Sequence, residues 1–279
     1  MNIKVIDNHK IKLADELNSA IEKSSRIRIA VAFAKYSGFR LVKDAFYSFL
    51  ANGGRATLLI GLDFHTTDPE VLREFINVSE SNNLFELYCL RGNLQQTATY
   101  HPKLYLFNQE HGNTTSIVGS SNLTRGGLID NVEINLEISS PNSDEVYSDL
   151  SNAFLQIEVA KRRIKPNIDY VNDYEELFRL AKKDKNISDH PKYKEMQKLE
   201  EELPTPKISN SDLVGWMKLV YDYLPEGQFA TNEIYKYEDV FKQKYPENQY
   251  IQAKIRQQLQ FLEKLGLLRK PSRNHWIKT

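Results

Sequence analysis

The chain has 279 residues, 41% hydrophobic and 27% charged, a composition typical of a soluble globular protein with room for two domains. Its 37 basic and 37 acidic residues give zero formal net charge, and its single cysteine excludes an internal disulfide and any cysteine-rich zinc site. The sequence contains neither an apolar run long enough for a membrane helix nor a hydrophobic leader. It therefore predicts a cytoplasmic protein with no membrane partner.

The first part of the chain alternates short strands with helices. We expect strands at 3–6, 27–33, 56–62 and 85–90, and helices at 13–23, 38–51 and 69–79. The strand at 56–62 is almost entirely apolar, as is typical of a strand buried on both faces. This alternation predicts an α/β domain whose mixed sheet is sandwiched by helices.

Three further strands are expected at 103–107, 115–118 and 132–138, and a helix at 143–163 ends the domain. Joined by loops, these strands would bring His101, Lys103, Ser120, Asn122 and Glu133 to one edge of the sheet. These residue types suit phosphodiester chemistry. Imidazole can be a nucleophile or proton donor near neutral pH, and a carboxylate can orient it. The ammonium, hydroxyl and amide groups can stabilise charge on phosphoryl oxygens.

Each part of this pattern has a simpler explanation when taken alone. A His-x-Lys pair on a strand is usually a solvated edge, and the sequence Gly119-Ser-Ser-Asn122 is usually just a turn. Both occur here at a fixed spacing, with Glu133 beyond them. The combination therefore favours a catalytic site.

The pattern resembles the phospholipase D superfamily, in particular the nuclease branch that includes BfiI-type restriction endonucleases. By position, His101 and Lys103 match the signature His and Lys, Ser120 and Asn122 match the G-S-x-N element, and Glu133 matches the acidic residue that supports the His. The resemblance spans roughly the first 160 residues. It departs at Asn108, where the signature has an Asp that is usually treated as structural.

The resemblance implies a mechanism as well as a fold. The chemistry of the superfamily uses two His-Lys motifs, whereas this chain has one. The resemblance therefore implies a homodimer with one composite active site, in which one His101 forms a phosphohistidine and the partner's His101 protonates the leaving oxygen. It implies no metal and no other cofactor.

Residues 164–207 differ in character from the domain predicted over 1–163. Charged residues dominate from Lys182 to Glu202, and Pro204 and Pro206 follow. We expect a helical, partly exposed linker here. Residues 208–279 then predict helices at 212–224, 231–245 and 249–265 and a hairpin over 267–278, the outline of a winged helix-turn-helix domain.

The third of these helices has an apolar face and a polar face. Arg pairs well with guanine edges and Gln with adenine edges in the major groove, while hairpin cations can contact phosphates. From Ala253 to Thr279 there are seven basic residues against the single acidic Glu263. These features favour binding to double-stranded DNA, although winged helices also mediate protein contacts and a Gln-rich face can simply be solvated. The predicted DNA-binding residues are Gln249, Gln252, Lys254, Arg256, Gln257, Gln260, Arg269, Lys270 and Arg273.

Residues 212–279 resemble the C-terminal domain of DpnI-type and Dam-replacing endonucleases. The segments that carry the likeness are 233–241, 245–248, 254–260 and 265–268. The likeness departs at 271–276, Pro-Ser-Arg-Asn-His-Trp, where that family tends towards a Gly-rich hairpin. It implies a site-specific endonuclease of the restriction type, in a system that can include a companion DNA methyltransferase.

Three other function classes remain open at this point. A phospholipase would need a lipid-facing apolar surface, and no amphipathic membrane segment is evident in the sequence. A non-cleaving DNA-binding regulator fits poorly with an intact motif. A nonspecific phosphodiesterase or RNase would not need the winged helix.

Overall fold

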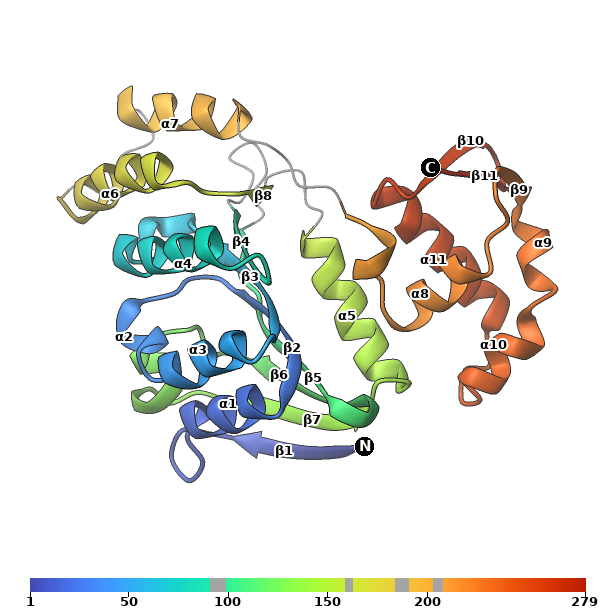
Figure 1. Cartoon of the computed structure of the whole chain (residues 1–279), viewed down its shortest axis with the longest axis horizontal. Helices are drawn as coiled ribbons and strands as arrows, with labels where there is room; N and C mark the ends of the chain where they lie inside the picture. Colours follow the sequence, from blue (N-terminus) through green and yellow to red (C-terminus); the bar gives the residue numbers. More distant parts are fainter. Residues whose placement is uncertain (91–98, 159–162, 184–190, 203–207) are drawn as a thin grey trace. The chain divides into compact units, whose positions relative to one another are not determined.

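The computed structural model describes residues 1–90, 99–158, 163–183, 191–202 and 208–279, which form two compact units (Figure 1). One unit, here called the sheet unit, comprises residues 2–139 and 161–205. The other, the winged-helix unit, comprises residues 140–160 and 206–279 together with Met1. Among the described residues, no helix is both long and apolar enough to cross a membrane.

The sheet unit is built on a mixed sheet, whose described strands have the order β1-β7-β6-β5-β2-β3-β4-β8. β2, β3 and β4 run parallel, whereas β5 pairs antiparallel with both β2 and β6. The strands are β1 (Asn2–Ile6), β2 (Ser24–Val31), β3 (Arg55–Gly61), β4 (Phe85–Leu90), β5 (Lys103–Gln109), β6 (Asn113–Gly119), β7 (Asn135–Pro141) and β8 (Arg163–Ile164). The predicted α/β class with a mixed sheet is confirmed, and β5 lies in the interior of that sheet.

Helices α1 (Leu13–Glu22), α3 (Lys43–Ala51) and α4 (Pro69–Ser81) lie on one face of the sheet (Figure 1). Apolar residues at helical spacing, such as Leu13 and Leu17 of α1, are buried against it. The helix predicted over 38–51 is divided into α2 (Tyr36–Phe39) and α3, because Val42 has non-helical backbone angles. Short helical turns follow β3, β5 and β6, at η1 (Asp63–His65), η2 (Glu110–Gly112) and η3 (Gly126–Asp130), and a fourth, η4 (Asn210–Asp212), lies near the start of the described C-terminal segment.

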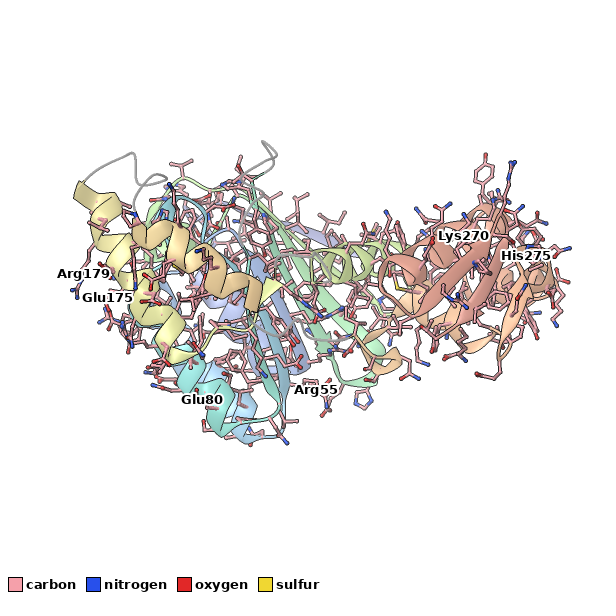
Figure 2. All side chains as sticks on the ribbon, turned by 90° about the horizontal axis from the view of Figure 1, so that it is seen from above. Arg55, Glu80, Glu175, Arg179, Lys270 and His275 are labelled. Atoms are coloured by element: carbon pink, nitrogen blue, oxygen red, sulfur yellow. The ribbon has the colours of Figure 1, made fainter. Side chains whose placement is uncertain are left out.

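The segment predicted as a helical, partly exposed linker is helical in its described part, but it belongs to the sheet unit instead of joining two domains. Its described part forms β8, α6 (Ile168–Lys183) and α7 (Pro191–Glu202). Tyr174 of α6 and Met196 of α7 are buried in the same core as the sheet. Arg73 of α4 donates to Glu175 at 2.6 Å, and Figure 2 shows Glu175 beside Arg179 on α6. The linker prediction was wrong here because apolar residues at helical spacing outweigh the surrounding charge.

The winged-helix unit follows the predicted outline, except that one predicted helix is divided into two and one strand was not predicted. It contains α8 (Gly215–Asp222), α9 (Thr231–Tyr235), α10 (Glu238–Lys244) and α11 (Ile251–Lys264), with β9 (Gln228–Ala230), β10 (Leu268–Ser272) and β11 (His275–Lys278). The helix predicted over 231–245 is divided where Tyr237 leaves helical geometry and packs on Tyr223, with ring centroids 4.8 Å apart. β9, which the sequence analysis did not predict, pairs with β11.

Helix α5 (Glu145–Glu158) groups with the winged-helix unit, although the sequence assigns it to the N-terminal domain. The backbone N–H of Trp216 donates to Ser148 Oγ at 2.9 Å, and Leu155 joins the core of the unit. Gly215 has φ +54°, and a Cβ there would lie 2.3 Å from Ser148 Oγ. Only glycine therefore lets α8 begin this close to α5.

A buried amide pair also joins α5 to α11. Gln258 lies on the apolar face of α11 and is completely buried, which is unusual for a polar side chain. Asn152 of α5 donates to its Oε1 at 3.4 Å. Gln258 is therefore accounted for by a hydrogen bond within the unit rather than by contact with a ligand.

Candidate active site

His101 and Lys103 lie side by side at the start of β5. His101 is exposed and precedes the strand, whereas Lys103 is its first residue and is 8% exposed. Lys103 Nζ lies 2.6 Å from Nδ1 and 3.0 Å from Nε2 of His101. Burial lowers the pKa of Lys103, while the negative charge of Glu133 acts in the opposite direction. A cation is thus held beside an accessible imidazole.

The residue before His101 is anchored to β3 and the turn after it. Tyr100 N donates to Asp63 Oδ2 at 2.9 Å, and Tyr100 Oη donates to the carbonyl of Leu59 at 3.1 Å. A Cβ at Gly61 would lie 2.6 Å from the Tyr100 ring, so the glycine makes room for it. These contacts fix the backbone that leads into His101. The sequence analysis did not predict the contact between Asp63 and Tyr100, because the two residues are separated by 37 positions along the chain.

Ser120 and Glu133 form a second pair. Ser120 Oγ donates to Glu133 Oε2, and Ile134 N donates to Ser120 Oγ at 3.1 Å. Asn131 Nδ2 lies 3.4 Å from Glu133 Oε1. No described hydrogen bond joins Glu133 to His101, so the role of Glu133 in orienting the imidazole stays a prediction.

Glu133 lies in the loop before β7, not on a strand. The strand was predicted to begin at Val132, but ladder pairing with β1 begins at Asn135, opposite Ile6. Before Asn135, Ile134 forms hydrogen bonds with Ser120 but is not part of the strand ladder. The loop allows the Glu133 carboxylate to turn towards the Ser120 hydroxyl.

Asn122 is held by the backbone after β2. Its Oδ1 accepts from Phe33 N at 3.2 Å, and its side chain is 8% exposed. Ala34 forms a parallel bridge with Leu123, and Lys35 N donates to Leu123 O at 2.9 Å. Because the oxygen end of the amide is engaged, Nδ2 is the end that can donate to a phosphoryl oxygen.

Asn135 positions the small-residue turn and was missed by the sequence analysis. It is 1% exposed; its Nδ2 donates to Ser121 Oγ at 2.9 Å and its Oδ1 accepts from Ser121 N at 3.2 Å. Tyr105 Oη donates to the carbonyl of Ser121 at 2.9 Å. Ser121, between Ser120 and Asn122, is therefore fixed from both sides. Asn108 lies farther along β5, opposite Arg26 and Thr114.

Most of the predicted DNA-binding residues are exposed in the winged-helix unit. Arg256 Nη1 donates to Tyr235 Oη at 2.8 Å, and Gln252 Nε2 donates to Glu238 at 2.8 Å. Lys270 and His275 lie on the two strands of the hairpin (Figure 2), with Lys270 Nζ 5.1 Å from the centre of the Trp276 ring. The exposed predicted residues are Gln249, Gln252, Arg256, Gln257, Gln260, Arg269, Lys270 and Arg273.

Lys254 has a different environment from the other predicted DNA-binding residues. Its side chain is 10% exposed, and its Nζ lies 2.7 Å from Asp149 Oδ1 and 3.5 Å from Glu145 Oε1 of α5. Its charge is therefore already paired within the unit. The helical position of Lys254 did not reveal this, because the sequence analysis placed α5 in the other domain.

The sheet unit has the fold of a phosphodiesterase of the phospholipase D type, and the His101–Lys103 and Ser120–Glu133 pairs lie at the ends of its strands. The chain belongs to the family described as "Cardiolipin synthase, PLD-like domain", whose model matches residues 13–157, and thus to the phospholipase D superfamily. A second family model, "Dam-replacing HTH domain", matches residues 212–278. Both resemblances predicted from the sequence are confirmed.

Three solved structures of low sequence identity match parts of this chain. NucT from Helicobacter pylori is 13% identical, with TM-score 0.43, over 56% of this chain and 94% of that one. Nuc from Salmonella typhimurium, a phospholipase D family member, is 16% identical, with TM-score 0.46, over 59% and 99%. Phosphatidylserine synthase from Haemophilus influenzae Rd KW20 is 14% identical, with TM-score 0.50, over 71% and 47%. No curated protein sequence matches this chain significantly.

Proposed function

We propose that the chain is a sequence-specific DNA endonuclease of the restriction type, which needs no metal ion. The observation that supports this most directly is the His101–Lys103 pair in a phosphodiesterase fold. A helix-turn-helix domain in the same chain supports double-stranded DNA as the substrate. A nonspecific nuclease would have little need for such a domain.

The proposed reaction has two steps at phosphorus. In the first, a ring nitrogen of His101 attacks, a P–N bond forms, and the P–O bond to the leaving nucleoside breaks as that oxygen takes a proton from a second imidazole. In the second, water attacks phosphorus, gives its proton to the second imidazole, and the P–N bond breaks. Lys103, Ser120 and Asn122 stabilise charge on the non-bridging oxygens.

The second imidazole comes from a second copy of the chain. The sequence has a single His-Lys motif, so we propose a homodimer in which the partner's His101 acts as acid and then as base. Two identical imidazoles can hold different protonation states because their titrations are coupled across the shared site. In this proposal the same system can include a companion DNA methyltransferase, and methylation of the recognition site can be either required for cleavage or forbid it.

The test is digestion of methylated and unmethylated plasmid DNA in EDTA, with wild type beside His101→Ala. We expect discrete fragments from the wild type alone, and a difference between the two plasmids if methylation protects the sites. Continuous degradation would instead indicate a nonspecific nuclease, and binding without cutting would indicate a regulator. Cutting that depends on added Mg²⁺ would contradict the proposed mechanism.

A further inference from the structure

Lys35 lies at the edge of the sheet that carries the candidate active site. β5 runs antiparallel to β2, so Val31 at the end of β2 pairs with Lys103 at the start of β5. Lys35 follows Val31 by four residues, and its side chain is exposed. The sequence analysis did not include Lys35 among the candidate site residues. The fold therefore brings a further cation to the same edge as Lys103.

The backbone around Lys35 is fixed to the turn that contains Asn122. Lys35 N donates to Leu123 O at 2.9 Å. A Cβ at Gly38 would lie 2.4 Å from Cα of Thr124, so only glycine lets α2 approach this turn so closely. Direct backbone contacts therefore set the position of Lys35 relative to Asn122.

The side chain of Lys35 points away from the apolar core. Its neighbour Ala34 forms a parallel bridge with Leu123, and both bridged residues are buried in the core of the sheet unit. Lys35 has extended backbone angles, φ −130° and ψ 146°, and successive residues of an extended segment point to opposite faces. Asn122 Oδ1 accepts from Phe33 N at 3.2 Å. Lys35 and the Asn122 amide therefore border the same short extension of β2, with the Lys35 ammonium in solvent.

Lys35 differs from nearby cations whose charges are already paired. Arg125 follows the small-residue turn, and its Nε lies 2.9 Å from Asp130 Oδ2. Lys43 of α3 lies 2.6 Å from Glu74 Oε1. Within the described ranges of the chain, no acidic side chain forms an ion pair with Lys35. The charge of Lys35 is therefore available to an anionic ligand.

We propose that Lys35 binds a backbone phosphate next to the scissile phosphate in the cleaved DNA strand. This inference rests on the proposed function, because it needs a substrate with several phosphates in a row. Each strand of duplex DNA carries one phosphate per about 3.4 Å of helix axis, and paired strands of a sheet lie about 4.8 Å apart. A phosphate bound at Asn122 thus has a neighbour within reach of the long Lys35 side chain. Lys35 then sets the register of the DNA, whereas Lys103 stabilises the reacting phosphate.

The test compares a substrate of many phosphates with a substrate of one. The first is duplex DNA, and the second is bis(p-nitrophenyl) phosphate, a diester without a neighbouring phosphate. The variants of the full chain are Lys35→Gln, which removes the charge, and Lys35→Arg, which keeps it. Arg55→Gln is the matched control, because Arg55 (Figure 2) is exposed but begins β3, about 20 Å along that strand from Gly61.

Duplex binding is measured by fluorescence anisotropy and hydrolysis of both substrates by initial rates, in EDTA at several salt concentrations. We expect Lys35→Gln to lower kcat/KM for duplex cleavage about threefold to tenfold, the effect of one exposed charged contact. The slope of log Kd against log salt concentration should fall in magnitude by about one, because one fewer counterion is released. Lys35→Arg and Arg55→Gln should keep the wild-type slope. Hydrolysis of the single diester should be unchanged in all three variants.

An unchanged salt slope in Lys35→Gln, or an equal loss with both substrates, would overturn this inference. An equal loss would mean that Lys35 acts on the reacting phosphate or on the fold. The proposed function fails separately, if the wild type binds duplex with a slope that depends on Lys35 but cuts no DNA. Wild-type cleavage with a slope that does not depend on Lys35 would leave the proposed function standing and remove this contact.

Discussion

Lys103 is subject to two opposing electrostatic effects. Its burial beside His101 lowers its pKa, and the charge of Glu133 raises it. Glu133 also accepts a hydrogen bond from Ser120. The Glu133 carboxylate thus opposes the effect of burial on the pKa of Lys103 and also accepts the hydrogen bond of the Ser120 hydroxyl.

Glu133→Gln tests this electrostatic role. Without the negative charge, the pKa of Lys103 falls further, so the lysine loses its proton at a lower pH. We expect the alkaline limb of the pH profile of kcat/KM for duplex cleavage to move to lower pH. The control is Glu137→Gln in β7, since the Glu137 carboxylate pairs with Lys4. This variant should leave the alkaline limb where it is in the wild type. If the alkaline limb of Glu133→Gln does not move, the charge of Glu133 does not raise the pKa of Lys103.

At the scale of elements, α5 is a helix that the sequence assigns to the N-terminal domain and that groups with the winged-helix unit in the structure. Residues 145–157 of α5 fall within the segment matched by the phospholipase-D-like family model, yet Ser148 and Asn152 bond to α8 and α11. β7 leads from the Glu133 loop towards α5 along the chain. The helix that presents the predicted base-reading residues is therefore packed on an element that follows the active-site strands directly in sequence.

Gly215→Ala measures how tightly α8 is packed on α5. Both Gly215 and Gly227 have positive φ, so alanine at either one costs about 1–2 kcal/mol of backbone strain. Only at Gly215 would the new Cβ also meet Ser148 Oγ, at 2.3 Å, whereas nothing lies within 4 Å at Gly227. We expect urea denaturation, followed by tryptophan fluorescence, to show a larger loss of stability for Gly215→Ala than for Gly227→Ala. Equal losses would mean that the α5 contact contributes nothing.

Arg256 and Lys254 provide a matched pair on α11 for the DNA-binding prediction. Arg256 is exposed, whereas Lys254 is paired with Asp149 and Glu145. Arg256→Gln should weaken binding to the target duplex by about 1–3 kcal/mol, a size typical of an Arg contact with a base. Lys254→Gln should leave affinity nearly unchanged and lower the free energy of unfolding instead. Fluorescence anisotropy titrations at fixed salt would check both, and equal loss of affinity in the two variants would contradict this assignment.

At the scale of the whole molecule, the sequence predicts local features well and distant pairings poorly. The spacing of His101, Lys103 and Ser120 in the sequence indicates the candidate site. The apolar periodicity of the sequence predicts the bounds of α1 and β4 closely. Asn135 and Asp63 were missed because each acts through a partner far along the chain. The fold class therefore followed from periodicity, whereas the support of the site required the three-dimensional contacts.

In the proposed reaction, His101 becomes covalently bonded to phosphorus without a metal ion. To test this, the protein reacts with a duplex oligonucleotide in EDTA, and the reaction is stopped with a denaturant that contains no acid. The mass of the protein and of its peptides is then measured. We expect an adduct of the phosphate-bearing DNA fragment on the peptide that contains His101, which acid releases and which His101→Ala lacks. Cleavage by the wild type with no adduct at any time, or an adduct on another residue, would contradict it.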